Sequence, residues 1–351
     1  MVQMIRTWLQ RLFSHPEAII LFLSLLFGVI AIVTMGHLLA PVIVSLVIAY
    51  VLQSMIIRLE KFQCPHRLAV ITVYVGFLGI VILSLLGLLP LLSHEFSNLI
   101  RETPNILTKA QSMLAQLAQR YPDYFSMDDI QSAIGNSRVE ITKTGQWVLS
   151  GTFVAIHNLI AIVVYAVLVP LLIYFFLMDR YKIFVWFEGF MPKQRRLLMQ
   201  VVSEFNQQIG NYIKGRVIEV LIVGIVSYIV FVIMGLHYAA LLGAIVGISC
   251  IIPYIGAVVV TVPVAMIGFW QWGWSAHFAY LMLSYAIIIA LDGNVLVPLL
   301  FSEALDLHPV AIIVSILFFG GLWGFWGVFF AIPLASLIKA VINAWPRSGM
   351  E

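Results

Sequence analysis

The sequence predicts an all-α, polytopic integral membrane protein with about eight transmembrane helices, two of them broken or re-entrant. Of the 351 residues, 62% are hydrophobic and only 10% are charged, and the mean hydropathy is +1.05. A soluble domain carries roughly 25% charged residues. The apolar residues also gather in runs of about 20, the length that crosses the hydrocarbon core of a bilayer as a helix. Together these observations favour a chain that is embedded mainly in the lipid bilayer.

The apolar runs and the polar stretches between them divide the chain into five expected parts. Six runs are uninterrupted, with a tight connection between the first two, and cover 18–35, 40–57, 68–92, 152–178, 217–234 and 277–298. Two further runs, 239–270 and 310–343, are interrupted. The expected parts are the first three transmembrane helices (1–92), a periplasmic helical insertion (93–150), a fourth transmembrane helix (151–178), a cytoplasmic amphipathic helical linker (179–215) and a transport core with the two broken segments (216–351).

Both long polar stretches carry apolar residues at helical spacing. In the outer stretch these are Ile106, Ala110, Met113, Leu114 and Leu117, and in the inner stretch Leu198, Val201, Val202, Phe205, Ile209 and Ile213. Such a stripe predicts a helix that packs on the membrane surface or on the bundle. A role in gating stays open as the alternative.

Basic residues near the expected spans predict the orientation of the chain. Clusters of Lys and Arg precede the first run, separate the second from the third and follow the fourth, whereas none lies between the first and the second. Cytoplasmic loops carry the excess of Lys and Arg. We therefore expect residues 93–150 outside the cytoplasm and both termini inside it, with Lys339 and Arg347 marking the C-terminal end.

The two interrupted runs of the last third predict a transport path. The first is broken around Pro253, Tyr254 and Gly256, and the second is broken by Gly320, Gly321, Gly324 and Gly327. Proline removes a backbone donor and glycine tolerates unwound backbone, and freed backbone groups cannot face lipid. Paired, interrupted segments point to a transporter binding site. The alternative is a pair of ordinary kinks, because Gly and Pro are common in membrane helices.

The charges leave the number of crossings open. If each broken segment crosses the bilayer, there are eight crossings and Glu303 is outside. If each is a re-entrant hairpin, there are six crossings and Glu303 is inside. The acidic loop over 302–308 lacks Lys and Arg, which slightly favours eight.

Asp292 is the clearest carboxylate expected at membrane depth. It lies inside the run 277–298, with Asn294 two residues on and Pro298 further along. A carboxylate at the centre of a membrane helix costs at least ~2.5 kcal/mol, so it usually faces a cavity or an ion path. The alternative is a hydrated group near the interface. Glu219 is expected at the inner interface.

The sequence carries no signature of an enzyme. It has no GxSxG, HExxH or Walker loop, the eight histidines lack metal-ligand spacing, and the two cysteines form no CxxC pair. A net charge of +3 is too small to suggest a nucleic-acid partner. We therefore expect no catalytic residue, no cofactor and no metal.

Seven ordered motifs, spread over nearly the whole chain, resemble those of the AI-2E family of transporters. They are Phe176–Arg180, Met191–Pro192, Asn211–Arg216, Ile252–Gly256, Asp292–Pro298, Leu307–Pro309 and the glycine run 320–327 with Pro333. Each motif is weak alone, but the series is specific. The resemblance implies eight membrane helices, a homo-oligomer with a pentamer as one form, and transport across the bacterial inner membrane.

The resemblance leaves the substrate open. The family is named for export of the signal autoinducer-2, and other members are sodium(lithium)/proton antiporters. Many relatives have Gln where this chain has Arg216, and many have Gly-Lys where it has Ser302-Glu303. Three hypotheses follow: a permease or exporter of a small polar solute, a monovalent cation/proton antiporter that uses Asp292, and a non-transporting membrane scaffold. Membrane lipids are expected partners of all three.

The predicted orientation can be tested by labelling single cysteines in intact cells. Because Lys and Arg cluster on alternate sides, we expect an impermeant thiol reagent to label Asp123→Cys from outside and Arg195→Cys only after the cells are opened. Labelling of Arg195→Cys from outside would contradict the orientation.

Overall fold

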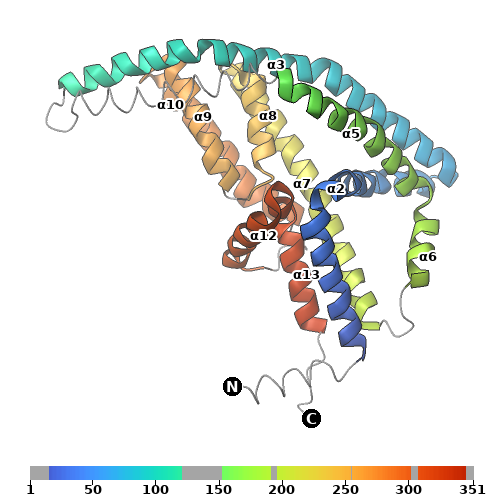
Figure 1. Cartoon of the computed structure of the whole chain (residues 1–351). Coiled ribbons are helices and arrows are strands. Elements are labelled where there is room, and N and C mark those ends of the chain that lie inside the picture. Colours follow the sequence, from blue (N-terminus) through green and yellow to red (C-terminus); the bar gives the residue numbers. More distant parts are fainter. Residues whose placement is uncertain (1–15, 121–151, 191–195, 254, 302–306, 345–351) are drawn as a thin grey trace, which may run out of the picture. The chain divides into compact units, whose positions relative to one another are not determined.

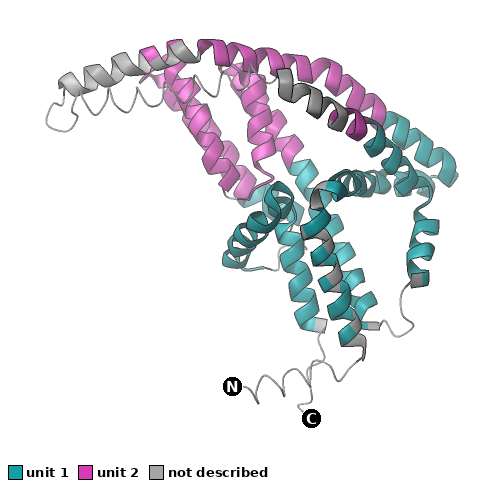
Figure 2. Ribbon diagram, viewed as in Figure 1, with its two compact units in different colours: residues 1–76, 167–219, 294–351 teal, residues 77–166, 220–293 magenta. Residues whose placement is uncertain are grey.

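The described chain is helical throughout. The computed structural model describes residues 16–120, 152–190, 196–253, 255–301 and 307–344, and every element in these ranges is a helix (Figure 1). The chain forms two compact units (Figure 2). Unit 1 holds residues 1–76, 167–219 and 294–351, and unit 2 holds 77–166 and 220–293. Each unit is therefore assembled from segments far apart in the sequence.

The prediction of an all-helical, polytopic membrane protein is confirmed. Among the described residues, six helices are long and apolar enough to cross a membrane: Leu38–Lys61, His66–Glu102, Leu197–Ile233, Ile255–Trp272, Ala276–Phe301 and Pro309–Phe329. A bent pair, Ile162–Met178 with Arg180–Gly189, raises the number to seven if it is one span; its two helices meet at 81°. Shorter apolar helices cover Ala239–Ser249 and Ala331–Asn343.

The first two helices are longer than the apolar runs predict. Helix α2 covers Pro16–Lys61 without interruption, so the tight connection expected after residue 35 is helical, and Pro41 lies inside it. Helix α3 covers His66–Arg120 and continues through the start of the expected outer insertion. Its 55 residues reach about 80 Å at 1.5 Å per residue, well beyond a hydrocarbon core of ~30 Å. The structure does not describe the side chains of the apolar stripe predicted between Ile106 and Leu117.

Helices α5, α6 and α7 occupy the stretch in which the fourth span, the linker and the fifth span are expected. Helix α5 covers Thr152–Met178, α6 covers Arg180–Phe190, and α7 covers Arg196–Ile233. The second half of the linker and the fifth span are thus one helix. The glycines of α7 lie inside the continuous helix, where they allow other side chains to approach closely. A Cβ at Gly215, for example, would lie 2.8 Å from the ring of Phe301.

The first broken segment is a hairpin within unit 2. Helix α8 covers Ala239–Ser249 and packs against α9, which covers Ile255–Trp272. The N–H of His237 donates to Gln271 Oε1 at 2.8 Å, and Gln271 Nε2 donates to the carbonyl of Gly235 at 2.7 Å. Because the residues before α8 and those ending α9 touch, the segment returns to the end from which it started.

Close backbone contacts hold α7 against α8. A Cβ at Gly243 would lie 2.9 Å from the Cα of Tyr228, and a Cβ at Gly247 would lie 2.8 Å from the Cα of Gly224. Small residues four apart allow membrane helices to approach in this way, since van der Waals packing replaces the hydrophobic effect between helices in lipid. The start of the hairpin is therefore fixed on α7.

The second broken segment also reverses direction. After α9 come α10 (Ala276–Leu291), the π-helical turn η1 (Asp292–Leu296) and α11 (Val297–Phe301). The second broken segment itself consists of α12, which covers Pro309–Phe329, and α13, which covers Ala331–Ala344. Inside α12, Gly324 has φ 59° and ψ −135°, a conformation that suits glycine alone. A Cβ at Gly327 would overlap the carbonyl of Phe319, eight residues earlier. The chain therefore folds back at Gly324.

Both hairpins place one glycine against a backbone carbonyl, and this contact can be tested in α8–α9. A Cβ at Gly256 would overlap the carbonyl oxygen of Ser249. We expect Gly256→Ala to destabilise the detergent-solubilised protein by ~1–3 kcal/mol, because the backbone must move. Thermal unfolding followed by tryptophan fluorescence measures the change.

The matched control is Gly79→Ala, on the open surface of α3, where an added Cβ meets nothing within 4 Å. This change should be neutral or slightly stabilising, because alanine is the better helix former. Equal unfolding temperatures for the two variants would contradict the close contact in the hairpin.

Candidate functional site

Asp292 lies where α10 gives way to a π-helical turn. Its backbone N–H donates to the carbonyls of Ile288 and Ile289, and the next four residues continue as η1. Pro298, which follows closely, has no N–H and clashes with the carbonyl four residues back, so a regular helix cannot pass unchanged through Asn294. A π-helical turn widens the helix locally, and such turns occur often at functional sites. The turn is thus the local consequence of the Asp-Gly-Asn…Pro sequence.

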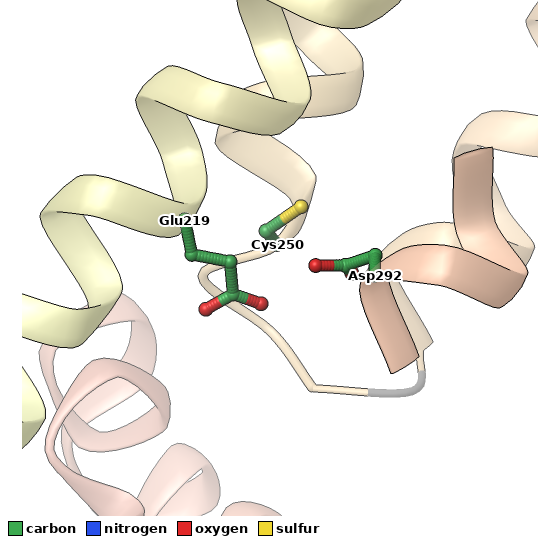
Figure 3. A group of neighbouring side chains, drawn as sticks. All are labelled: Glu219, Cys250 and Asp292. Carbon is green, nitrogen blue, oxygen red and sulfur yellow. The ribbon is translucent and has the colours of Figure 1, made fainter. Parts of the chain in front are cut away.

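In unit 2, the half-buried Asp292 lies next to the tip of the α8–α9 hairpin. A carboxylate oxygen of Asp292 comes within 4.8 Å of the Sγ of Cys250, the buried residue that caps α8. Figure 3 draws both side chains, together with Glu219 of α7. The pair offers one thiol and one carboxylate. A carboxylate beside a helix break is suited to hydrogen bonding a polar solute or a cation.

The tip of the hairpin is tightly wound rather than open. The N–H groups of Cys250, Ile251 and Ile252 donate to carbonyls three residues back at 3.0 to 3.2 Å. The N–H of Gly256 donates to the carbonyl of Ile252 at 2.9 Å. The freed donors expected from the sequence are therefore satisfied locally by 3₁₀-type bonds, as the apolar surroundings require. Tyr254 lies outside the described residues.

The other predicted path residues belong to unit 1. Asn294 and Pro298 are exposed, and the four glycines lie around the reversal at Gly324. Aromatic rings pack around this reversal: Trp323 and Trp326 each stack on Phe330 with ring centroids 6.3 Å apart. The second break is therefore an aromatic-packed turn. Among the ten predicted path residues, the structure places Asp292 next to the first hairpin, to which Pro253 and Gly256 belong.

A buried ion pair on α7 was not predicted as a site. Arg216 Nη1 donates to Glu219 Oε2 at 2.7 Å, and the two side chains are 5% and 2% exposed. The sequence predicts Glu219 at the interface, but the structure buries it. Opposite charges three residues apart at the start of an apolar run are the signal that could have revealed the pair.

Aromatic groups of unit 1 surround the guanidinium of Arg216. Its Cζ lies 5.3 Å from the ring centre of Tyr212 and 5.0 Å from that of Phe301. The hydroxyl of Tyr212 donates to the carbonyl of Phe329 at 2.9 Å, which ties α7 to α12. Cation–π attraction and the Glu219 carboxylate together compensate a charge that water does not reach. The arrangement holds a neutral pair of charges inside an apolar cluster.

Comparison with known proteins identifies relatives along the whole chain. Residues 19–347 match the family described as AI-2E family transporter. PerM of Escherichia coli (strain K12), named as a candidate permease, is 44% identical over 346 residues, or 99% of this chain and 98% of PerM. YueF of Bacillus subtilis (strain 168), named as a candidate transport protein, is 24% identical over 88% of this chain and 84% of its own. The AI-2 transport protein TqsA of Escherichia coli (strain K12) is 23% identical, with 91% of each chain covered.

The buried pair predicts an asymmetric response to substitution. We expect Arg216→Gln to destabilise the protein by ~3–5 kcal/mol, because it leaves the buried Glu219 carboxylate without its guanidinium. The double change Arg216→Gln with Glu219→Gln should recover most of the loss, since both charges are then gone. Denaturant unfolding in detergent micelles measures both variants.

Lys214→Gln serves as the control. Lys214 is a neighbouring cation on α7 whose Nζ lies 5.5 Å from the ring centre of Tyr50. Its removal should cost less than about 1 kcal/mol. Equal losses in the single and double Arg216 variants would show that the ion pair does not determine the effect.

Proposed function

The chain belongs to the AI-2E family of transporters, and on that premise we propose that it is a permease of the bacterial inner membrane that moves a small polar solute. The multi-pass helical fold and the family membership support a transport role. The conjunction of Asp292, the π-helical turn η1 and the α8–α9 hairpin carries the finer proposal. A helical hairpin that ends beside an intramembrane carboxylate is a geometry in which transporters bind their cargo.

The proposed binding region lies in unit 2, around Asp292 and the hairpin tip. Asp292 accepts hydrogen bonds from the solute or holds a proton, and the tip at Pro253 and Gly256 limits access to it. Asn294, Pro298 and the glycines Gly320, Gly321, Gly324 and Gly327 are proposed as path residues on the sequence pattern alone. Tyr254 is included on the sequence pattern alone.

The chemistry of this region supports a proposal for the class of substrate. A carboxylate beside a thiol and an apolar hairpin suits a small solute with hydroxyl or amine donors. An autoinducer-2-like metabolite has this character, and TqsA, a relative with 23% identity, is named an AI-2 transport protein. We propose a metabolite of that general kind as the cargo.

A second candidate function is sodium(lithium)/proton antiport. The observation in its favour is Asp292 itself, because an antiporter needs a carboxylate that exchanges a proton for a cation at membrane depth. A non-transporting scaffold would need neither η1 nor Asp292, which makes it the weakest alternative. Both termini are proposed to be cytoplasmic, and a homo-oligomer, with a pentamer as one form, is proposed as the working assembly.

Replacement of Asp292 tests the proposed role directly. Asp292→Asn keeps the volume of the side chain and much of its hydrogen bonding but removes the charge and the exchangeable proton. We expect flux into proteoliposomes to fall roughly tenfold or more, the effect of about 1.4 kcal/mol on the slowest step. Its pH dependence should flatten if Asp292 carries a proton. The stability of the protein should hold or rise, because a desolvation cost is removed.

The assay should compare monovalent cations with small polar metabolites, which separates antiport from permease activity. Asp179→Asn is the control, since this carboxylate pairs with the exposed Lys182 after α5. Normal, pH-dependent flux in well-folded Asp292→Asn protein would exclude a charge-carrying role for Asp292. Flux that is absent in the unmodified protein for every solute would instead favour the scaffold.

A further inference from the structure

Unit 2 contains a polar pocket that the proposed transport path does not use. It has a volume of about 340 Å³ and is lined by Glu95, Asn98, Glu102, His237 and Tyr238. The first three residues follow one face of α3 at spacings of three and four. The last two directly precede α8. The pocket is therefore built where α3 meets the start of the hairpin.

Two hydrogen bonds fix the carboxylates in this pocket. Glu102 Oε2 accepts the hydroxyl of Tyr238 at 2.7 Å, and Glu95 Oε2 accepts the N–H of Leu241, in the first turn of α8, at 2.7 Å. Tyr238 itself has a left-handed backbone, with φ 60° and ψ 34°, which is unusual for a bulky residue. Among the described residues each carboxylate makes this single hydrogen bond, so the second oxygen of each can accept from a ligand.

The pocket is strongly negative. Among the residues that the structure describes, its lining holds two carboxylates and no Lys or Arg; Arg101, the nearest cation along α3, is exposed and lies outside the lining. Burial raises the pKa of the Tyr238 hydroxyl, and the hydrogen bond to Glu102 and the charges of Glu102 and Glu95 raise it further. The field of both carboxylates thus reaches across the pocket and favours a positively charged occupant.

The spacing of the ligating groups argues against a bare metal ion. A metal requires several ligand atoms within 2.0 to about 2.6 Å of one centre. In the described part of the chain, the ligand atoms of Glu95, Glu102 and His237 do not converge within 4.8 Å of one another. An organic ammonium group carries several N–H donors on a larger frame, which suits dispersed acceptors in a pocket of about 340 Å³.

We propose that the pocket formed by Glu95, Asn98, Glu102, His237 and Tyr238 binds a small organic amine cation. Glu95 and Glu102 supply charge-assisted hydrogen bonds to its N–H donors. The Asn98 amide and the His237 ring add polar contacts at the rim. Binding at this pocket does not depend on the transport role of Asp292, so the two proposals can fail separately.

The competing explanation is that Glu95 and Glu102 only hold α8 against α3. Glutamine separates the two roles, because its amide oxygen still accepts from Leu241 and Tyr238 while the negative charge is lost. A purely structural pair would tolerate the change to glutamine at the level of stability. A cation pocket would lose its ligand.

The test is calorimetric titration of the full chain in detergent with the diamine putrescine. Parallel titrations use uncharged butanediol, and calcium and zinc salts. We expect saturable binding of putrescine alone, and a loss of affinity of about tenfold or more in Glu95→Gln with Glu102→Gln, since two charge-assisted bonds are weakened. Glu60→Gln, which alters an acid paired with His66 in unit 1, should leave the affinity unchanged.

A second variant keeps the test decisive if the double change unfolds the protein. Asn98→Lys leaves both carboxylates and their bonds to α8 in place but tethers an ammonium group inside the pocket, and should abolish putrescine binding. Unchanged putrescine affinity in either variant, or equal binding of butanediol, overturns the proposal. Calcium or zinc binding that displaces putrescine and disappears in the Glu95 and Glu102 double variant overturns the choice of an organic amine.

Discussion

The hydrocarbon core of a bilayer supplies no hydrogen bonds, and this constraint explains how the interruptions of the chain are built. A break in a membrane helix exposes donors and acceptors that water cannot reach. At the α8–α9 tip, the N–H groups of Cys250 and Ile251 therefore bond to carbonyls three residues back. At η1, the helix widens into a π-turn ahead of Pro298 instead of unwinding. Each break redirects side chains while its backbone stays bonded within the protein.

The same constraint governs the charges. Arg216 and Glu219 neutralise one another across 2.7 Å inside an aromatic cluster of unit 1. In unit 2, a carboxylate oxygen of Asp292 lies within 4.8 Å of the Cys250 Sγ, and this thiol donates to the carbonyl of Val246. The ion pair stabilises one arrangement of the cluster, whereas a carboxylate at a break in a membrane helix is suited to binding a proton or a solute. We therefore propose a structural role for the ion pair and a role in transport for Asp292.

Close approach of backbones connects these sites to the fold. Gly224 and Gly247 bring α7 against α8, and Gly256 lies on the carbonyl of Ser249. Because helices in lipid associate through packing rather than through the hydrophobic effect, such contacts are the main source of precision at the hairpin. They hold the tip next to Asp292. At the other end of α8, Glu95 and Glu102 hold its first turn to α3 and at the same time create a negative pocket.

The sequence by itself determined the membrane class and the positions of the two breaks, and it indicated Asp292 as a candidate site residue, because hydropathy, Pro and Gly act through local chemistry. The fusion of the linker with the fifth span in α7 could not be predicted, since Gly215 interrupts a helix or packs in it depending on Phe301, far along the chain. Chain reversal at the breaks was likewise decided by contacts such as that of His237 with Gln271. The burial of Glu219 and the pocket between α3 and α8 also required tertiary structure, because hydropathy and spacing report what a residue is and not which distant side chains meet it.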